Sequence, residues 1–504
     1  MSVIRRVVLV GLALAVTTML IAAGAAYWFF SGDGVRLALE RQASEWLGQP
    51  VHIASATGQV FPRLGIQLRE VRIGEPAQMT LAGVDVSTSL RALLSRRIED
   101  ADVIISDSRI DLPLSIGRPA NLPGARDAAR VPGSRAAASP PPVELVSVRT
   151  IALRDIAIGS RGREIVASAD ATLAGSELRL ARFVASSERT RLEASGTVAL
   201  GPRIEARLDV IASRLDLDEL LALAGAFLPE RTSRNERSAR PSARVAAHIT
   251  AEAARAASLD ARKLSTDLTL EGERVALEPL RFELFGGTYE GVFQATLGDA
   301  LDMRLTSSVA GLDVAQLAAF GGVPDTITGR LSGRGTFTGR GLDVGSMLQS
   351  ARGSGSASIV AGSIKRLNLI RTVVLFFGRP EPDAPPGADT FDRIEATFSL
   401  AEGVFNAQEF SLRSPDADID GRGTLSLASK ALEGTADLRL SEALSKQAGT
   451  DLVRFTREEN RVVLPARISG TLATPRITID AAAAARRGLK NETERRLRDL
   501  FDVR

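Results

Sequence analysis

Hydrophobic and polar residues follow two different patterns along this 504-residue chain. The first is an apolar run without any charged residue at 7–30, interrupted only by two threonines. At about 1.5 Å per residue, a helix of this length crosses a bilayer core of roughly 30 Å. Arg5 and Arg6 precede the run and Asp33 follows it, so the positive-inside rule predicts a cytosolic amino terminus. We therefore expect a single-pass membrane anchor whose lipid-facing positions include Val7, Leu12, Leu20, Tyr27, Trp28 and Phe30.

A cleavable signal peptide is the alternative for this run. Ala23-Gly24-Ala25 resembles the small-residue site at which signal peptides are cleaved. The apolar run continues past that tripeptide through Tyr27-Trp28-Phe29-Phe30, and such aromatic clusters are typical of membrane interfaces. We favour the anchor, which predicts that the rest of the chain lies on the far side of the membrane.

The second pattern is an alternation of apolar and polar residues with a period of two, which is typical of half-buried β-strands. It is clear at Ile394, Ala396, Phe398 and Leu400, and it recurs from residue 51 to residue 479. Helical spacing is rarer. We expect helices at 35–47, 215–228, 314–320, 364–377 and 442–459, and from Ala481 onwards. The sequence therefore predicts a mainly β protein with a few helices, of the α+β class.

These few helices cannot cover the apolar faces of the roughly two dozen strands that the length and pattern suggest. A sheet with one apolar face buries it against helices, against another sheet or against itself. The surplus apolar face is therefore closed by curvature of the sheet, or it remains open to an apolar ligand. An ordinary sandwich or barrel core is the alternative at this stage.

Composition narrows the chemistry. Cysteine is absent, which excludes thiolate catalysis and thiolate metal ligation. The formal charge of +3 gives the whole chain no nucleic-acid signature. Aromatic residues make up only 4% of the chain, so its cores are expected to consist of Ala, Val, Leu and Ile.

No motif of an enzyme is present. The two histidines, His52 and His248, stand in alternating strand-like contexts, which favours a surface or structural role over general-base catalysis. Asp416, Asp418 and Asp420 have a spacing reminiscent of a calcium loop, but position 427 is Leu where such a loop needs Glu. We expect solvent-facing strand positions there. The sequence thus predicts no enzyme, no catalytic residues, no metal and no cofactor.

Short motifs of small and apolar residues follow one another in a definite order along the chain. Near the amino-terminal end they are Trp46-Leu47-Gly48-Gln49-Pro50-Val51, Pro62-Arg63-Leu64, Val71-Arg72-Ile73-Gly74 and Ser89-Leu90-Arg91-Ala92-Leu93-Leu94-Ser95. Later ones are Gly341-Leu342-Asp343, Ser350-Ala351-Arg352-Gly353, Ala361-Gly362-Ser363-Ile364, 464–472 and Thr474-Pro475-Arg476-Ile477. In this order, behind an amino-terminal anchor, they resemble the AsmA family of Gram-negative envelope proteins.

The resemblance implies a specific fold. AsmA-like proteins are similar to the chorein-type, repeating-β-groove lipid transporters, in which a long, strongly curved antiparallel sheet forms a trough lined with apolar side chains. Acyl chains travel in the trough while headgroups stay in water. On this view the alternating apolar positions near the carboxyl end line the groove: Ile394, Ala396, Phe398, Leu400, Ile419, Leu425, Leu427, Leu438, Leu440, Ile468, Leu472, Ile477 and Ile479.

Three segments rich in proline, arginine or serine interrupt the alternation and indicate linkers. Together with the resemblance they divide the chain into seven parts. These are a cytosolic start and anchor (1–32), a chorein-like segment (33–112), a Pro-rich linker (113–142), a β-rich groove segment (143–228), a flexible linker (229–243), an AsmA-like β-groove segment (244–480) and a basic carboxyl-terminal helix (481–504). That helix could contact an anionic membrane or remain solvated.

The resemblance also implies a location and partners. We expect a protein of the cell inner membrane whose bulk lies in the periplasm, where it binds membrane phospholipids and takes part in lipid transport between inner and outer membranes. The alternative is a non-enzymatic scaffold or assembly factor that regulates outer-membrane protein assembly and targeting. Outer-membrane or periplasmic proteins are further expected partners, and nucleic acid is not.

Overall fold

The computed structural model describes most of the predicted β-rich segments. The described residues are 33–59, 64–75, 77–88, 97–98, 100–112, 144–145, 148–160, 163–201, 203–220, 243–298, 300–341, 344–365, 389–447, 457–458 and 461–501. The predicted anchor at 7–30 lies outside them, as do the linkers at 113–142 and 229–242. Across the described residues, no helix combines the length and the apolar character that a membrane crossing requires.

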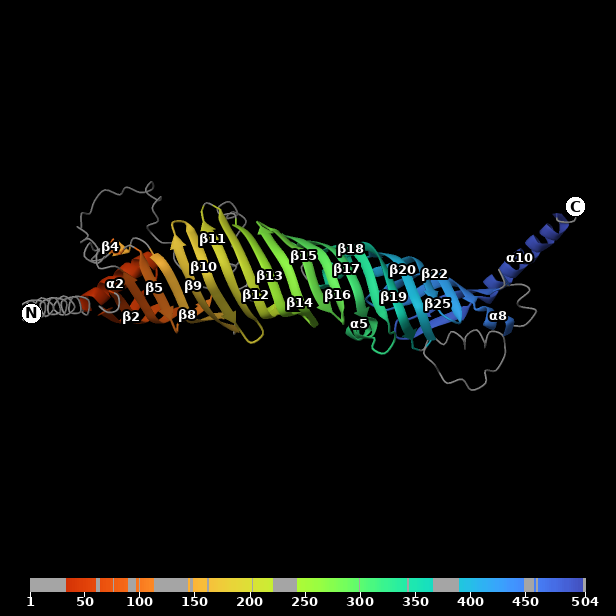
Figure 1. Ribbon diagram of the computed structural model, residues 1–504, viewed down its shortest axis with the longest axis horizontal. Helices are drawn as coiled ribbons and strands as arrows, with labels where there is room; N and C mark the ends of the chain where they lie inside the picture. Colours follow the sequence, from red (N-terminus) through yellow and green to blue (C-terminus); the bar gives the residue numbers. More distant parts are fainter. Residues whose placement is uncertain are drawn as a thin grey trace, which may run out of the picture. The chain divides into compact units, whose positions relative to one another are not determined.

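The chain divides into two compact units, Met1–Asp260 and Ala261–Arg504. This boundary falls inside the segment 244–480, which the sequence treats as one part. Both units are built mainly of strands that pair with their neighbours (Figure 1). The mainly β character predicted from the alternating pattern is confirmed.

The first unit begins with one helix and continues as a sheet. Its elements are α2 (Asp33–Leu47), β1 (Val51–Gln59), β2 (Leu64–Ile73), β3 (Met79–Thr88), β4 (Arg97–Ile98), β5 (Ala101–Ser106), β6 (Arg109–Leu112), β7 (Glu144–Leu145), β8 (Val148–Ser160), β9 (Arg163–Ala174), β10 (Glu177–Ser186), β11 (Arg191–Leu200), β12 (Ile204–Asp216) and β13 (Ala243–Ala256). The helix predicted at 35–47 is confirmed by α2. Of the helix predicted at 215–228, residues 217–220 are helical, 215–216 belong to the strand β12, and 221–228 lies outside the described residues.

The sheet of the first unit is mixed, so the prediction of an antiparallel sheet is wrong there. β5 and β6 both pair with β8 in parallel, and β12 pairs with β13 in parallel. Parallel neighbours need a long crossover connection, whereas antiparallel neighbours need only a tight turn. These three parallel pairings join strands that are connected through residues 113–147 or 217–242, where the predicted linkers lie.

The second unit is a regular succession of strands. Its elements are β14 (Leu259–Glu271), β15 (Arg274–Leu284), β16 (Gly287–Leu297), β17 (Leu301–Asp313), α5 (Val314–Phe320), β18 (Arg330–Gly341), α6 (Val344–Ser350), β19 (Arg352–Ile364), β20 (Asp389–Ala401), β21 (Val404–Arg413), β22 (Ala417–Ser426), β23 (Leu432–Leu440), α8 (Glu442–Gln447), β24 (Arg457–Glu458), β25 (Arg461–Gly470), β26 (Pro475–Ile479) and α10 (Ala481–Phe501). From β14 to β23 each described pairing joins consecutive strands in antiparallel fashion.

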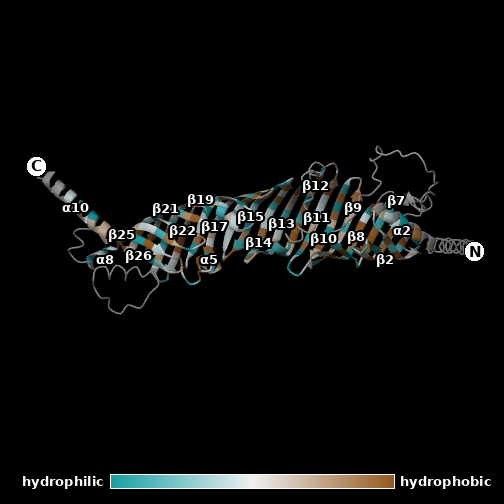
Figure 2. Ribbon diagram, turned by 180° about the vertical axis from the view of Figure 1, so that it is seen from behind, coloured by the Kyte–Doolittle hydropathy of each residue, from teal (hydrophilic) through white to brown (hydrophobic). Residues whose placement is uncertain are grey.

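The register of these pairs brings like residues together. Leu305 of β17 lies opposite Phe293 of β16 on one side and Phe337 of β18 on the other. Because successive side chains point to opposite faces, this register separates the sheet into an apolar face and a polar face. The alternation is visible as brown and teal residues along single strands in Figure 2. We use these two names for the faces of each unit's sheet.

Each unit closes part of its apolar face in a different way. In the first unit, Leu39, Ala43 and Leu47 of α2 pack against a buried cluster of Val51, Ile53, Val71 and Leu81. In the second unit the buried cluster contains no helical residue among its described members. It consists of Phe391, Leu412, Ala417, Ile419, Ala436, Leu438, Leu440, Val462, Leu464, Ala466 and Ile477.

Candidate functional site: an apolar trough

The predicted groove residues that lie on strands come from β20, β22, β23, β25 and β26, and the register places them on one face. Ile394 pairs with Leu412, which pairs with Ile419, which in turn pairs with Leu438. The same face continues through Leu464 and Ala466 to Ile479. The structure therefore assigns one common face to Ile394, Ala396, Phe398, Leu400, Ile419, Leu425, Leu438, Leu440, Ile468, Ile477 and Ile479.

Two predicted groove residues fall outside the strands. Leu427 follows the end of β22 and is 38% exposed, and Leu472 lies in the turn between β25 and β26. Their amide groups bond to neighbouring turns, from Leu427 to the carbonyl of Gly403 and from Leu472 to that of Lys430. The sequence pattern includes them because it carries the alternation beyond the last paired residue. Strand geometry does not assign them to either face.

Burial divides the shared face into a closed part and an open part. Leu438 and Leu440 are no more than 1% exposed and Ile419 is 3% exposed, and all three belong to the buried apolar cluster that closes this part of the face. Phe398, Leu425 and Ile468 keep partial exposure, as do Leu305 and Phe337 further along the same face. The accessible apolar surface of the second unit therefore extends over β14 to β21 and the turn-proximal ends of β22 to β25.

Sheet curvature makes the apolar face concave. Arg330 at the start of β18 is in register with the start of β22 and not with its end. The segment between α5 and β18 and the turn after β22 therefore lie at opposite ends of the strands. The Lys430 ammonium nevertheless donates a 3.3 Å hydrogen bond to the carbonyl of Gly322. Ile327, which lies between α5 and β18, packs against the buried apolar cluster. The sheet therefore curls with its apolar face inside.

Two short helices border this trough. Asp313 caps α5 by accepting hydrogen bonds from the amides of Ala315 and Gln316, which starts the helix directly at the end of β17. α6 follows β18 at the opposite edge, and the sulfur of Met347 lies 3.0 Å from the position that a Cβ on Gly339 would take. The helix predicted at 314–320 is confirmed by α5.

Glycines and aromatic rings form the floor in the middle of the trough. A Cβ on Gly353 would lie 2.4 Å from the Phe337 ring, and a Cβ on Gly355 would lie 2.8 Å from the Phe398 ring. Phe337 and Phe398 have centroids 6.5 Å apart, and Phe405 meets Phe398 edge-on at 5.2 Å. The rings lie flat because the neighbouring strand presents no side chain. Of these three aromatic residues, only Phe398 is among the predicted groove residues. The alternating glycines at 333–341 and 353–355 are the sequence signal that could have identified the other two.

In the first unit alanine takes the place of these glycines and rings. Ala167, Ala169 and Ala171 of β9 are at most 8% exposed and lie opposite Ile156, Leu153 and Ile151 of β8. Further buried alanines follow on β12 and β13. The sequence places the groove residues only near the carboxyl end, but the apolar face is present in both units.

The polar face carries the charged residues. Arg413 bonds to Asp420, Arg461 contacts Asp418 at 2.7 Å, and Arg281 contacts Glu290 at 2.7 Å. Asp418 and Asp420 thus lie on the solvent side of β22, where each pairs with an arginine. This agrees with the prediction that they occupy solvent-facing strand positions. His52 is largely exposed and its Nδ1 lies 3.3 Å from the Glu40 carboxylate. Within the described ranges no group of three metal-ligating side chains occurs.

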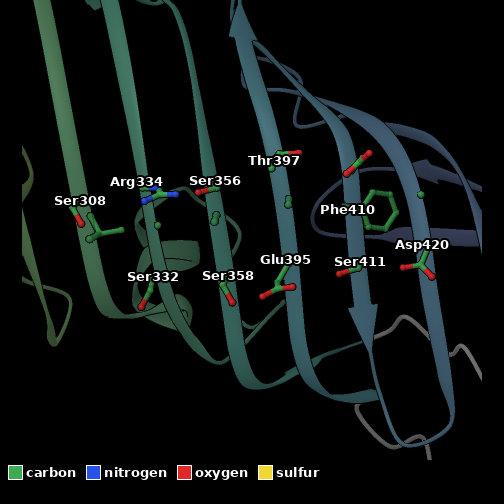
Figure 3. A pocket seen from close by; sticks show the side chains of 16 residues that line it. Ser308, Ser332, Arg334, Ser356, Ser358, Glu395, Thr397, Phe410, Ser411 and Asp420 are labelled. Atoms are coloured by element: carbon green, nitrogen blue, oxygen red, sulfur yellow. The ribbon is translucent and has the colours of Figure 1, made fainter.

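Shallow furrows run across the polar face between rows of polar side chains. One, of about 750 Å³, crosses β17 to β22. Figure 3 shows its two walls, with Ser332, Ser358, Glu395, Ser411 and Asp420 in one row and Ser308, Arg334, Ser356 and Thr397 in the other. Its floor is the backbone of Gly333, Ala357 and Ala396, and the methyl groups of the two alanines belong to the apolar face. The furrow is thus separate from the trough.

These features define a class of protein: a one-sided β-sheet protein with a continuous apolar face that is partly open in its middle. Residues 221–410 match the family model of the AsmA family. Protein AsmA of Escherichia coli (strain K12) is 21% identical over 246 residues, which are 47% of this chain and 38% of that protein. The matched segment belongs to the AsmA family, which confirms the resemblance seen in the sequence. The aligned part spans well under half of that relative, and no solved structure matches the chain.

Proposed function

We propose that this protein binds phospholipid acyl chains in the apolar trough and takes part in lipid transport between the inner and outer membranes. One observation carries the proposal: the apolar face from β14 to β21 is continuous in register and yet partly exposed. A water-exposed apolar surface of this extent is costly unless a ligand covers it. The proposed role is non-enzymatic.

The physical properties of the trough suit a cargo that slides. Each CH₂ removed from water contributes about 0.8 kcal/mol, so about a dozen methylenes bind with roughly 10 kcal/mol without any directional contact. Contacts with Leu305, Phe337 and Phe398 depend on area and hardly on position along the trough. A lipid can therefore change neighbours without crossing a large barrier.

The location is part of the proposal. Membership of the AsmA family supports a role in the cell envelope and in outer-membrane homeostasis. The hydrophobic run at 7–30 supports a single-pass anchor in the inner membrane, with the described β-rich units in the periplasm. A scaffold or assembly factor acting on outer-membrane proteins is the competing role, and it needs no lipid in the trough.

Photo-crosslinking of the full-length chain in bacterial membranes tests the proposal. Phe398 is replaced by p-benzoylphenylalanine, and Thr397 serves as the matched control because it is the adjacent residue on the polar face. After irradiation, mass spectrometry of the peptide that contains the crosslinker identifies any lipid adduct. We expect phospholipid adducts at position 398 and at most about a tenth as many at position 397.

The outcomes separate the two roles. Adducts confined to position 398 support lipid binding in the trough. Protein adducts without lipid at position 398 would favour the scaffold. Equal lipid labelling at both positions would mean that the sheet contacts membrane nonspecifically, and the proposal would be wrong.

A further inference from the structure

Three hydroxyl groups interrupt the apolar face near the start of the second unit's sheet. Thr266 of β14, Leu280 of β15, Gly291 of β16 and Ser307 of β17 are paired in one row across four strands. Tyr289 precedes Gly291 by one position on the same face, and its hydroxyl lies 2.7 Å from the position that a Cβ on Gly291 would take. The Tyr289 hydroxyl therefore leans into the row formed by Thr266 and Ser307.

The Thr266 hydroxyl has no hydrogen-bond partner in the part of the chain that the structure describes. The residue is 3% exposed, and its Oγ1 is the one buried side-chain polar atom without a partner among the described residues. Burying an unpaired hydroxyl costs about 1–3 kcal/mol, and valine would fill the same space without that cost. The neighbouring positions of this face on β14, Leu268 and Leu270, are apolar. The unpaired hydroxyl therefore lowers the free energy of unfolding, and a hydrogen bond from it to a ligand would offset this loss.

Tyr289 and Ser307 form the second part of the row. Their side chains share a hydrogen bond, and burial raises the pKa of the Tyr289 phenol. Phe282 stacks on the Tyr289 ring at 4.4 Å, which fixes its position on the trough floor. Each hydroxyl has one hydrogen to donate, so one mutual bond uses one of the two and leaves one donor available. The row thus offers two donors, one from Thr266 and one from the Tyr289–Ser307 pair.

We propose that Thr266, Tyr289 and Ser307 form a binding site for the ester carbonyls of a glycerolipid whose acyl chains occupy the trough. This inference rests on the proposed function. An ester carbonyl is neutral, accepts hydrogen bonds and is covalently joined to an acyl chain, so it enters an apolar trough together with that chain. A charged headgroup would lose its hydration there at much greater cost. The site gives the sliding cargo a preferred position.

A ligand-side comparison tests this inference. Full-length protein carrying p-benzoylphenylalanine at Phe293, two positions beyond Gly291 on the same face, is mixed with vesicles. The vesicles contain equal amounts of diester and diether phosphatidylcholine with identical chain lengths. Mass spectrometry distinguishes the two adducts by mass. Since a hydrogen bond contributes a factor of about three to ten in affinity, we expect about fivefold more ester adduct than ether adduct.

Variants assign the preference to individual hydroxyls. In the Thr266→Val variant the ester-to-ether ratio should fall towards one, while its unfolding temperature should rise because an unpaired buried hydroxyl is removed. Ser307→Ala and Tyr289→Phe should lower the ratio partially. Thr397→Ala, an exposed residue on the polar face outside the trough, is the control and should leave the ratio unchanged.

The possible failures are distinguishable. If neither lipid labels position 293, the proposed function itself is contradicted. If both lipids label it equally in the wild-type chain, the trough binds lipid but the ester site is wrong. A preference for ester lipid that Thr266→Val leaves unchanged, in a chain of raised unfolding temperature, would also overturn the assignment of Thr266.

Discussion

The two units shelter the same kind of apolar face by different means. The first unit closes one part with helix α2, whose Leu39, Ala43 and Leu47 cover Val51 and Ile53. The second unit closes its part by curling the sheet, which brings Leu438 and Leu464 to full burial. Along the rest of the face, the first unit has buried alanines and the second has glycines next to aromatic rings.

This difference shows that a one-sided sheet has two independent design variables. One is the element that covers the face, and the other is the size of the side chains that line it. Alanine leaves a shallow, uniform floor. Where glycine lies next to phenylalanine, the ring lies flat over the glycine. The ring then extends along the sheet and not into the trough.

Truncation of buried side chains should have the largest effect on the free energy of unfolding in both units. Leu438→Ala in the second unit and Ile53→Ala in the first remove fully buried side chains, and each should lower the free energy of unfolding by about 3 kcal/mol. Leu305→Ala, at a partly exposed position of the same face, should lower it by only about 1 kcal/mol. Urea unfolding followed by hydrogen exchange in peptides of each unit measures the three losses. A loss at Leu305 equal to that at Leu438 would mean that the trough is closed.

Glycine substitutions should show how strongly the second unit depends on the close packing of glycines and aromatic rings in the trough floor. A Cβ on Gly353 would lie 2.4 Å from the Phe337 ring and 2.5 Å from the carbonyl of Thr336, so Gly353→Ala should destabilise the second unit by about 2 kcal/mol. Gly298→Ala is the control, since its Cβ would meet no atom closer than 3.5 Å. Thermal unfolding of both variants gives the comparison. Equal stability of the two variants would show that the rings move freely.

The smallest expected effect concerns the helix α10. Asp480 accepts a hydrogen bond from the amide of Ala483 and lies 3.0 Å from Arg467, and these contacts hold the pKa of its carboxyl below the ordinary 3.8. A lowered pKa stabilises the folded state above the ordinary value, and this contribution is lost as the pH falls through the folded-state pKa. Asp480→Asn should therefore speed exchange of the Ala483 amide about threefold at pH 7.

Once the pH falls below the lowered folded-state pKa of the Asp480 carboxyl, the wild type and Asp480→Asn should converge in the exchange rate of the Ala483 amide. The amide of Ile53, which bonds to Glu40 of α2 in the first unit, serves as the internal control. A rate difference that persists unchanged at low pH would assign the effect to side-chain shape and not to charge.

Sequence reasoning identified much of this architecture. The period of two at 394–400 was sufficient to place Ile394, Ala396, Phe398 and Leu400 on one face, because alternation in a strand is a local property. The helices at 35–47 and 314–320 were also found, since their spacing and end signals are local. The parallel pairings were missed, because pairing partners depend on where long connections return the chain. Leu427 and Leu472 were included because strand ends are set by register.

The sequence by itself determined that one face of every strand is apolar and that too few helices exist to cover it. The tertiary structure alone decided which parts of that face are buried. Leu425 and Leu438 have the same pattern in sequence, yet only Leu438 is enclosed, because sheet curvature brings distant strands around it. The register of neighbouring strands also places Thr266 and Ser307 in one row, although they are 41 residues apart in the sequence. Such proximity arises from hydrogen-bond register between strands, which no local pattern encodes.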